Sequence, residues 1–174
     1  MDSIITDISR LRIPSRLTTK AEVAELKLRE RILEALPTAW CKGFGLAAIQ
    51  IGVPVQYALY FFKGQPVHLL NPKILAYGNP ILSKLEGCLS IPEKRITTVR
   101  YNDIEILNDG QTFAVSGLEA VIVQHEIDHM NGITIYDRAQ NPYPDIGRND
   151  QCPGCAREGV SIKWKKCKEH NRTA

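Results

Sequence analysis

The pattern of apolar and polar positions predicts a helix near the start of the chain. From Ala21 to Leu36, apolar residues recur every three or four positions with charged residues between them. Thr19 and Glu22 have the spacing of a capping box, which begins a helix. Pro37 ends it, because the residue before a proline avoids helical backbone angles.

A second helix is predicted from Ser116, which with Glu119 has the spacing of another capping box, to a stop at Gly132. Its apolar residues are Leu118, Val121, Ile122 and Ile127. We expect these side chains to bury the helix against a sheet.

Between the two helices the pattern changes to short runs of β-prone residues separated by Gly, Pro and Asn. The predicted strands are Val55 to Phe62, Val67 to Leu70, Arg95 to Tyr101, Ile104 to Leu107 and Thr112 to Val115. Asn108, Asp109 and Gly110 predict a hairpin turn between the last two strands. The order of helix, strands and helix predicts an α+β domain with antiparallel sheets packed around the second helix.

Composition is that of an ordinary folded domain, since 44% of the 174 residues are apolar and 24% are charged. The net charge of +3 is too small to predict nucleic-acid binding by the whole chain. The segment from Met1 to Arg16 lacks the features of a secretory signal, and no run of apolar residues is long enough to span a membrane. We therefore expect a cytoplasmic protein with no membrane partner, whose five cysteines are metal ligands or reduced thiols.

Pro142 and Pro144 interrupt the pattern after Tyr136 and indicate a linker. We expect a catalytic domain at residues 1–140 and a small separate tail at residues 145–174. Each part has its own candidate chemistry.

The second predicted helix contains the sequence His125-Glu126-Ile127-Asp128-His129, an HExxH pattern. Two histidines four residues apart lie on the same face of a helix, so both can bind one metal ion. Glu126 is rotated by about 100° from His125 and can contact a metal-bound water without being a ligand. Burying these polar groups without a use would be costly, so the pattern indicates a metal-dependent hydrolase.

A tetrahedral catalytic ion takes a third protein ligand and keeps its last position for water. The metzincin pattern requires a histidine at position 135, which is Ile135. The gluzincin pattern requires a downstream glutamate, and Glu158 and Glu169 both fall in the tail. Cys88 is a further candidate because a thiolate is a good soft ligand, although a single cysteine is more often a buried core thiol.

Three blocks of sequence occur in order: GFGLAAIQ from Gly43 to Gln50, EGCLS from Glu86 to Ser90, and QHEIDH from Gln124 to His129. Together they resemble the three motifs of peptide deformylase, and the resemblance extends from about residue 43 to residue 137. It implies Cys88, His125 and His129 as ligands of one divalent metal ion, with Fe²⁺ expected and Zn²⁺, Ni²⁺ or Co²⁺ as other occupants. It also implies removal of the formyl group from the N-terminal formylmethionine of newly made polypeptides.

The resemblance assigns the other site residues as well. Glu126 would act as general base and acid, while the Gln50 amide and the Leu89 backbone N–H would stabilise the oxyanion. Glu86 would pair with Arg100 and orient the second motif. From their positions we expect substrate contacts at Gly43, Phe44, Gly45 and Leu46 of the first motif and at Leu118, Val121 and Ile122, which precede His125 on the helix. The alternatives are core packing for the apolar side chains and a simple turn for the glycines.

The tail resembles the small zinc-binding motif at the C-terminus of the preprotein translocase ATPase. Cys152, Cys155, Cys167 and His170 form C-x2-C and C-x2-H pairs, a spacing that can close a second, structural Zn²⁺ site. Its lysines would then face the ribosome or another anionic surface. The alternative is a solvated basic tail with incidental cysteines.

Two functions of other classes share parts of these patterns. A metalloprotease would use the same helix with a different third ligand. A non-catalytic zinc-stabilised interaction module would explain the tail but would leave Glu126 and Gln50 without a role.

Overall fold

The computed structural model describes residues 2–36 and 45–139. The predicted tail, including Cys152, Cys155, Cys167 and His170, lies outside the described residues, as do Gly43 and Phe44. None of the described helices is long and apolar enough to cross a membrane.

Three short helices form the N-terminal region: α1 (Ile8–Leu11), α2 (Lys20–Glu25) and α3 (Leu28–Ala35). The single helix predicted here is divided, because Lys27 adopts a left-handed conformation with a φ of 49° between α2 and α3. Thr19 caps α2 by accepting a hydrogen bond from the Glu22 backbone N–H. The Glu22 side chain instead contacts Arg16 and Thr18, so only half of the predicted capping box forms.

Two three-stranded antiparallel sheets follow, which confirms the predicted mixture of helices and antiparallel sheets. The first sheet contains β1 (Gly45–Ala47), β2 (Tyr57–Phe62) and β3 (Gln65–Leu70). The second contains β4 (Lys73–Cys88), β5 (Ile91–Asn108) and β6 (Gln111–Ser116). The turn predicted between β5 and β6 is present, with positive φ angles at Asp109 and Gly110.

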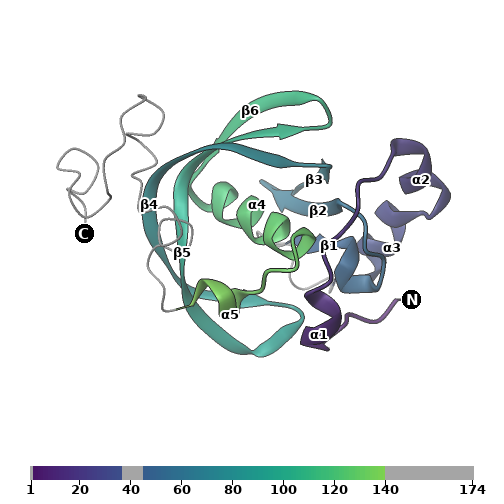
Figure 1. Cartoon of the computed structure of the whole chain (residues 1–174), viewed down its shortest axis with the longest axis horizontal. Helices are drawn as coiled ribbons and strands as arrows, with labels where there is room; N and C mark the ends of the chain where they lie inside the picture. Colours follow the sequence, from purple (N-terminus) through teal and green to yellow (C-terminus); the bar gives the residue numbers. More distant parts are fainter. Residues whose placement is uncertain (1, 37–44, 140–174) are drawn as a thin grey trace.

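β4 and β5 are much longer than the short strands that the sequence predicted. Gly78, Pro80 and Gly87 all lie within β4 and are paired with β5, although such residues usually interrupt strands. Register shifts between Ser83 and Glu86 and between Gly87 and Cys88 bend this ribbon near its end. The second sheet therefore curves around the next helix (Figure 1).

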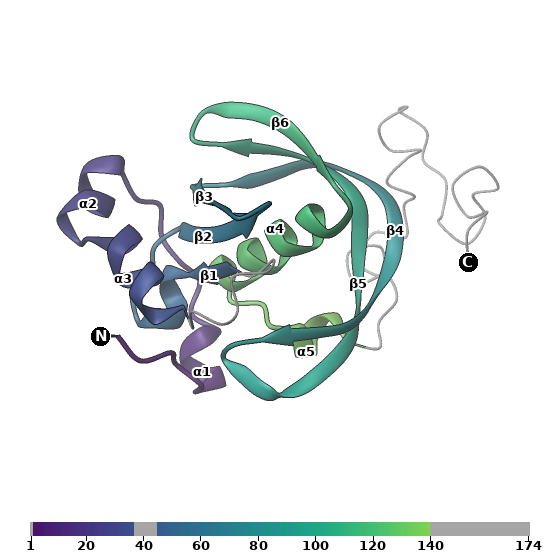
Figure 2. The same cartoon turned by 180° about the vertical axis from the view of Figure 1, so that it is seen from behind.

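The helix α4 (Gly117–Met130) lies at the centre, between the two sheets (Figure 1). It contacts β1 and β2 of the first sheet, β5 and β6 of the second, and the short 3-10 helix η2 (Ala48–Ile51). Viewed from behind, α2 and α3 lie beyond the first sheet, on the side away from α4 (Figure 2). The main core fills the space around α4, and a second apolar cluster lies beneath α3.

The predicted capping box at the start of α4 is wrong. Ser116 makes no side-chain cap within the described part of the chain, and Gly117 begins the helix with a φ of 61°. Glu119 instead accepts a hydrogen bond of 2.9 Å from the Tyr60 hydroxyl. The predicted stop is correct, since α4 ends at Met130 and Gly132 follows with a φ of 72°.

The short helix α5 (Ile135–Arg138) follows α4 and packs on β4 and β5. Ala139 after it forms an antiparallel bridge with Thr98 of β5. Asp137 of α5 accepts hydrogen bonds from the backbone N–H and the hydroxyl of Thr134, which fixes the start of this helix.

Candidate active site

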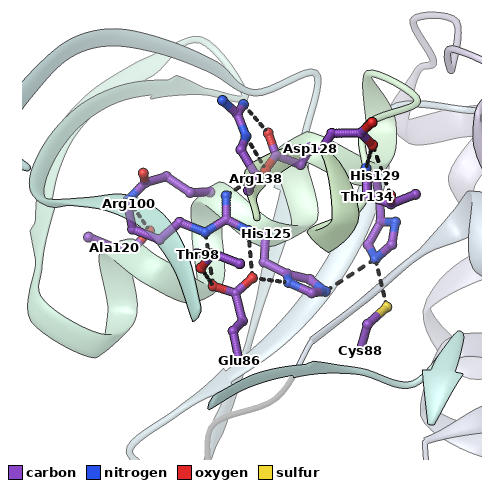
Figure 3. Close-up of polar contacts among 12 residues, drawn as sticks. Glu86, Cys88, Thr98, Arg100, Ala120, His125, Asp128, His129, Thr134 and Arg138 are labelled. Carbon is purple, nitrogen blue, oxygen red and sulfur yellow. Dashed lines mark hydrogen bonds and ion pairs between the residues drawn. The ribbon is translucent and has the colours of Figure 1, made fainter. Parts of the chain in front are cut away.

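Three potential metal donors converge beside α4 (Figure 3). His125 and His129 lie one turn apart on the helix, and Cys88 faces them from the end of β4. The Cys88 Sγ is 3.2 Å from His129 Nε2, which is itself 3.2 Å from His125 Nε2. All three donor atoms lie within 4.8 Å of one another, so this cluster could hold a metal ion.

The donor set fits a transition metal. With metal–nitrogen bonds of about 2.0–2.1 Å and a metal–sulfur bond of about 2.3 Å, neighbouring donors of a tetrahedral ion lie roughly 3.3–3.6 Å apart. The two observed separations of 3.2 Å are close to this range. A sulfur and two imidazole nitrogens suit zinc or iron better than magnesium or calcium, which prefer oxygen ligands.

The surroundings of Cys88 favour the protonation state that a metal ligand needs. Burial alone would raise the pKa of its thiol, but the contacts with His125 and His129 lower that pKa to about 5. The thiolate, which is the form that binds metals, is therefore favoured at neutral pH.

Glu86 fixes the orientation of the His125 ring. His125 Nδ1 lies 2.7 Å from Glu86 Oε1, which leaves Nε2 directed toward the other two donors. Thr98 and Arg100 donate hydrogen bonds to the same carboxylate, and the predicted pairing of Glu86 with Arg100 is confirmed. Burial would raise the pKa of Glu86, but its contacts with His125 and Arg100 hold that pKa far below the usual value.

Glu126 is the one buried acid of this cluster whose charge is disfavoured. Its side chain is 2% exposed, and its Oε2 atom has no hydrogen-bond partner among the described residues. Burial raises the pKa of Glu126 to about 7. The carboxylate can therefore both accept and release a proton near neutral pH.

Gln50 presents its amide group to the same site. Its Oε1 atom accepts a hydrogen bond of 2.9 Å from the Ala47 backbone N–H, which fixes the amide orientation. Its Nε2 atom donates to the Ser90 hydroxyl at 3.0 Å and lies 3.7 Å from Cys88 Sγ. Sequence reasoning missed this role of Ser90, although it belongs to the second motif.

A pocket of about 210 Å³ lies against these residues, between β1, β4 and α4. Its polar wall includes Gln50, Glu86, His125 and Glu126, and Leu89 also borders it. Four of the predicted substrate-binding residues line it: Gly45, Leu118, Val121 and Ile122. Leu46 does not line it, because its side chain is fully buried in the apolar cluster beneath α3.

Behind the donor cluster, the contacts of Asp128 with Arg100 and Arg138 were not predicted, although the pairing of Arg100 with Glu86 was. Arg100 Nη1 lies 2.5 Å from Asp128 Oδ2, and Arg138 of α5 contacts both oxygens of Asp128 (Figure 3). The available signal was the acidic residue inside the HExxH pattern, because a carboxylate buried next to a metal-binding histidine requires a cationic partner.

Comparison with known proteins gives consistent results. The sequence model of the family described as "Polypeptide deformylase" matches residues 5–144. The peptide deformylase of Agrobacterium fabrum is 38% identical over 137 residues, which cover 73% of this chain and 79% of that protein. The peptide deformylase of Desulfosudis oleivorans is 36% identical over 124 residues, which cover 65% of this chain and 72% of that protein.

Solved structures of the same family share the fold. The crystal structure of peptide deformylase from Thermotoga maritima matches with a TM-score of 0.67 and 31% identity, covering 80% of this chain and 97% of that one. The structure of a peptide deformylase from Synechococcus elongatus in complex with actinonin matches with a TM-score of 0.70 and 27% identity. That match covers 93% of this chain and 87% of the other.

Proposed function

The chain belongs to the polypeptide deformylase family, and we propose that Cys88, His125 and His129 hold its catalytic metal ion while Glu126 moves the protons of the reaction. The family reaction removes the formyl group from the N-terminus of newly made polypeptides. The observation that carries the proposal is the convergence of a sulfur and two imidazole donors beside a buried carboxyl group in one pocket.

Glu126 is the general base and acid in this proposal. When bound by these three donors, a divalent cation would supply the acidity that the reaction needs, by lowering the pKa of water from 15.7 toward about 7. Glu126 would accept a proton from the attacking water, since the pKa of its own side chain is about 7, while the water oxygen bonds to the formyl carbon. As the bond between the formyl carbon and the nitrogen breaks, Glu126 would return the proton to the amine, so that formate and the free N-terminus leave the site.

Gln50 and the Leu89 backbone N–H stabilise the negative charge that develops on the formyl oxygen. Ala47 and Ser90 hold the Gln50 amide in place beside Cys88, so little reorganisation is needed during the reaction. A donor of this kind contributes about 2.7–4 kcal/mol to the transition state.

The apolar wall of the pocket receives the methionine side chain. Val121 and Ile122 form the buried part of this wall, and Leu118 stands at its exposed edge. β1 is one of the two edge strands of the first sheet in the described part of the chain. Its free side supports pairing of the extended substrate backbone at Gly45, with Gly43, Phe44 and Leu46 completing this segment.

Two further proposals concern the identity of the metal ion and the role of the tail. We infer Fe²⁺ as the native ion from the family resemblance, with Zn²⁺, Ni²⁺ or Co²⁺ able to use the same donors. For the tail, the cysteine spacing supports a structural zinc at Cys152, Cys155, Cys167 and His170. Its basic residues support contact with the ribosome, where nascent chains emerge.

Measuring two reactions in parallel tests the function. Purified protein loaded with Fe²⁺ or Co²⁺ is incubated with formyl-Met peptides and, separately, with unformylated peptides that a metalloprotease can cleave internally. We expect formate release from the first and no cleavage of the second. Internal cleavage without formate release would support the metalloprotease, and the absence of both reactions in metal-loaded protein would support a non-catalytic module.

A further inference from the structure

A chain of buried charged groups connects the candidate metal donor His125 to α5. His125 Nδ1 contacts Glu86 at 2.7 Å, and Arg100 bridges Glu86 and Asp128 with its closest contacts at 2.5 Å. Arg138 of α5 closes the chain by donating to Asp128 Oδ2 at 2.9 Å and to Oδ1 at 2.6 Å (Figure 3). The side chains of Glu86, Arg100 and Asp128 are at most 7% exposed, and that of Arg138 is 13% exposed.

Glu86 and Asp128 carry one negative charge each, and Arg100 and Arg138 carry one positive charge each, so these four buried groups balance in charge. Removing one member of such a buried set leaves a charge without compensation, which is far more costly than loss of a surface ion pair. Without Arg138, the single positive charge of Arg100 would have to neutralise both Asp128 and Glu86.

We propose that Arg138 is a positioning residue for the metal centre. It supplies a second positive charge to Asp128, which Arg100 contacts with Nη1 only, while Arg100 holds Glu86 with Nε and Nη2, and Glu86 in turn fixes the ring of His125. Groups that orient a metal-binding histidine through its other ring nitrogen typically affect metal affinity or activity by about 10–100-fold. The inference rests on the proposed role of His125 as a ligand.

The chain provides a matched control within the same helix. Asp137, the neighbour of Arg138, pairs with Arg12 at 2.8 Å, and these side chains are 33% and 47% exposed. Replacing Arg12 with methionine removes an arginine–carboxylate pair from α5 without touching the buried charges. Replacing Arg138 with methionine also removes an arginine–carboxylate pair of α5, but this pair, with Asp128, is one of the buried ones.

The test compares Arg138→Met, Arg138→Lys and Arg12→Met in the full chain. The dissociation constants of Co²⁺ and Zn²⁺ are measured by competition with a chelating dye, and kcat and KM are measured with a formyl-Met peptide at saturating metal. We expect Arg138→Met to weaken metal binding about 10–100-fold and to lower kcat, with KM little changed because Arg138 does not line the substrate pocket. Arg138→Lys should recover part of the affinity, and Arg12→Met should match the parent.

A double variant separates charge balance from a general loss of stability. In Arg138→Met/Asp128→Asn the uncompensated carboxylate is gone, so metal affinity should rise above that of Arg138→Met. Absence of this recovery, or unchanged metal affinity in Arg138→Met, would overturn the inference. If Cys88→Ser loses the metal while Arg138→Met does not, only the role of Arg138 fails. If neither variant loses it, the proposed ligand set fails as well.

Discussion

The carboxylate of Glu126 occupies the space that a side chain at residue 45 would need. A Cβ atom on Gly45 would lie 2.4 Å from Glu126 Oε1 and 2.7 Å from its Cδ. The glycine of β1 therefore makes room for the proposed base, in addition to offering its backbone at the sheet edge. This contact links the first motif to the third.

The substitution Gly45→Ala should displace the Glu126 carboxylate without removing any donor. We expect kcat for a formyl-Met peptide to fall by at least about tenfold, and by no more than the roughly 10²–10⁴-fold that a positioned acid–base group contributes. Metal content should stay at that of the parent. Gly64→Ala is the control: no atom of the described residues lies within 4 Å of a Cβ there, and although the φ of 78° should make alanine cost stability, kcat should stay at that of the parent. Normal turnover in Gly45→Ala would show that the close contact has no catalytic importance.

Glu126→Gln keeps the shape of the side chain but removes its ability to accept a proton. We expect metal content to be unchanged and deformylation to fall by about 10²–10⁴-fold. Metal analysis and formate release on the same sample provide the measurement. Turnover near that of the parent would remove Glu126 from the mechanism.

The pH dependence of the reaction should follow Glu126. Only its ionised form can accept a proton, and its pKa of about 7 means that this form is depleted as the pH falls below 7. For a single ionisation we expect kcat/KM to decrease about eightfold between pH 6.5 and 5.5. Cys88, with a pKa of about 5, is still largely a thiolate in that window. Constant kcat/KM over the window, with metal content verified at each pH, would contradict this assignment.

Cys88→Ser tests the ligand that defines the class of enzyme. A neutral hydroxyl replaces a thiolate, so metal affinity should fall by more than the roughly 10–100-fold expected for loss of an outer contact to a ligand. Dialysis against a chelator, followed by metal analysis, provides the measurement. Cys41→Ser is the control, because Cys41 lies outside the three motifs, and it should keep the metal. Equal metal retention by both variants would exclude Cys88 from the ligand set.

Local sequence patterns predicted the features that depend on residues close together in the sequence. The extent of α4, its stop at Gly132 and the turn at Asp109 and Gly110 are examples. The length of β4 was not predictable in this way, because pairing with β5 carries that strand through Gly78 and Pro80. The predicted cap at Glu119 also failed because of a tertiary contact, since the Glu119 carboxylate accepts a hydrogen bond from the Tyr60 hydroxyl.

The candidate site was predictable to the extent that its residues fall into motifs. His125 and His129 are related by helical spacing, and Cys88 entered through the family resemblance. The partners of Asp128 were not predictable, because Arg100 and Arg138 come from different elements and meet only in the folded chain. Leu46 was predicted beside the substrate, but its side chain is fully buried in the core, so only its backbone is left for the proposed pairing.

The last prediction concerns the two-part organisation of the chain, with the proposed catalytic residues before residue 140 and the cysteine-bearing segment after it. Truncation after Gln140 retains Arg138, its contacts with Asp128 and the bridge of Ala139 with Thr98. We expect the truncated protein to hydrolyse short formyl-Met peptides with kcat/KM close to that of the full chain. We also expect it to lose one zinc equivalent per chain, because Cys152, Cys155, Cys167 and His170 are removed together.

A variant of the full chain with Cys152 and Cys155 replaced by serine is the control, and it should lose the same zinc while keeping its length and charge. Unchanged zinc content in both proteins would eliminate the second metal site. Loss of activity in a folded truncated protein that retains its catalytic metal would mean that the tail contributes to the wall of the active site.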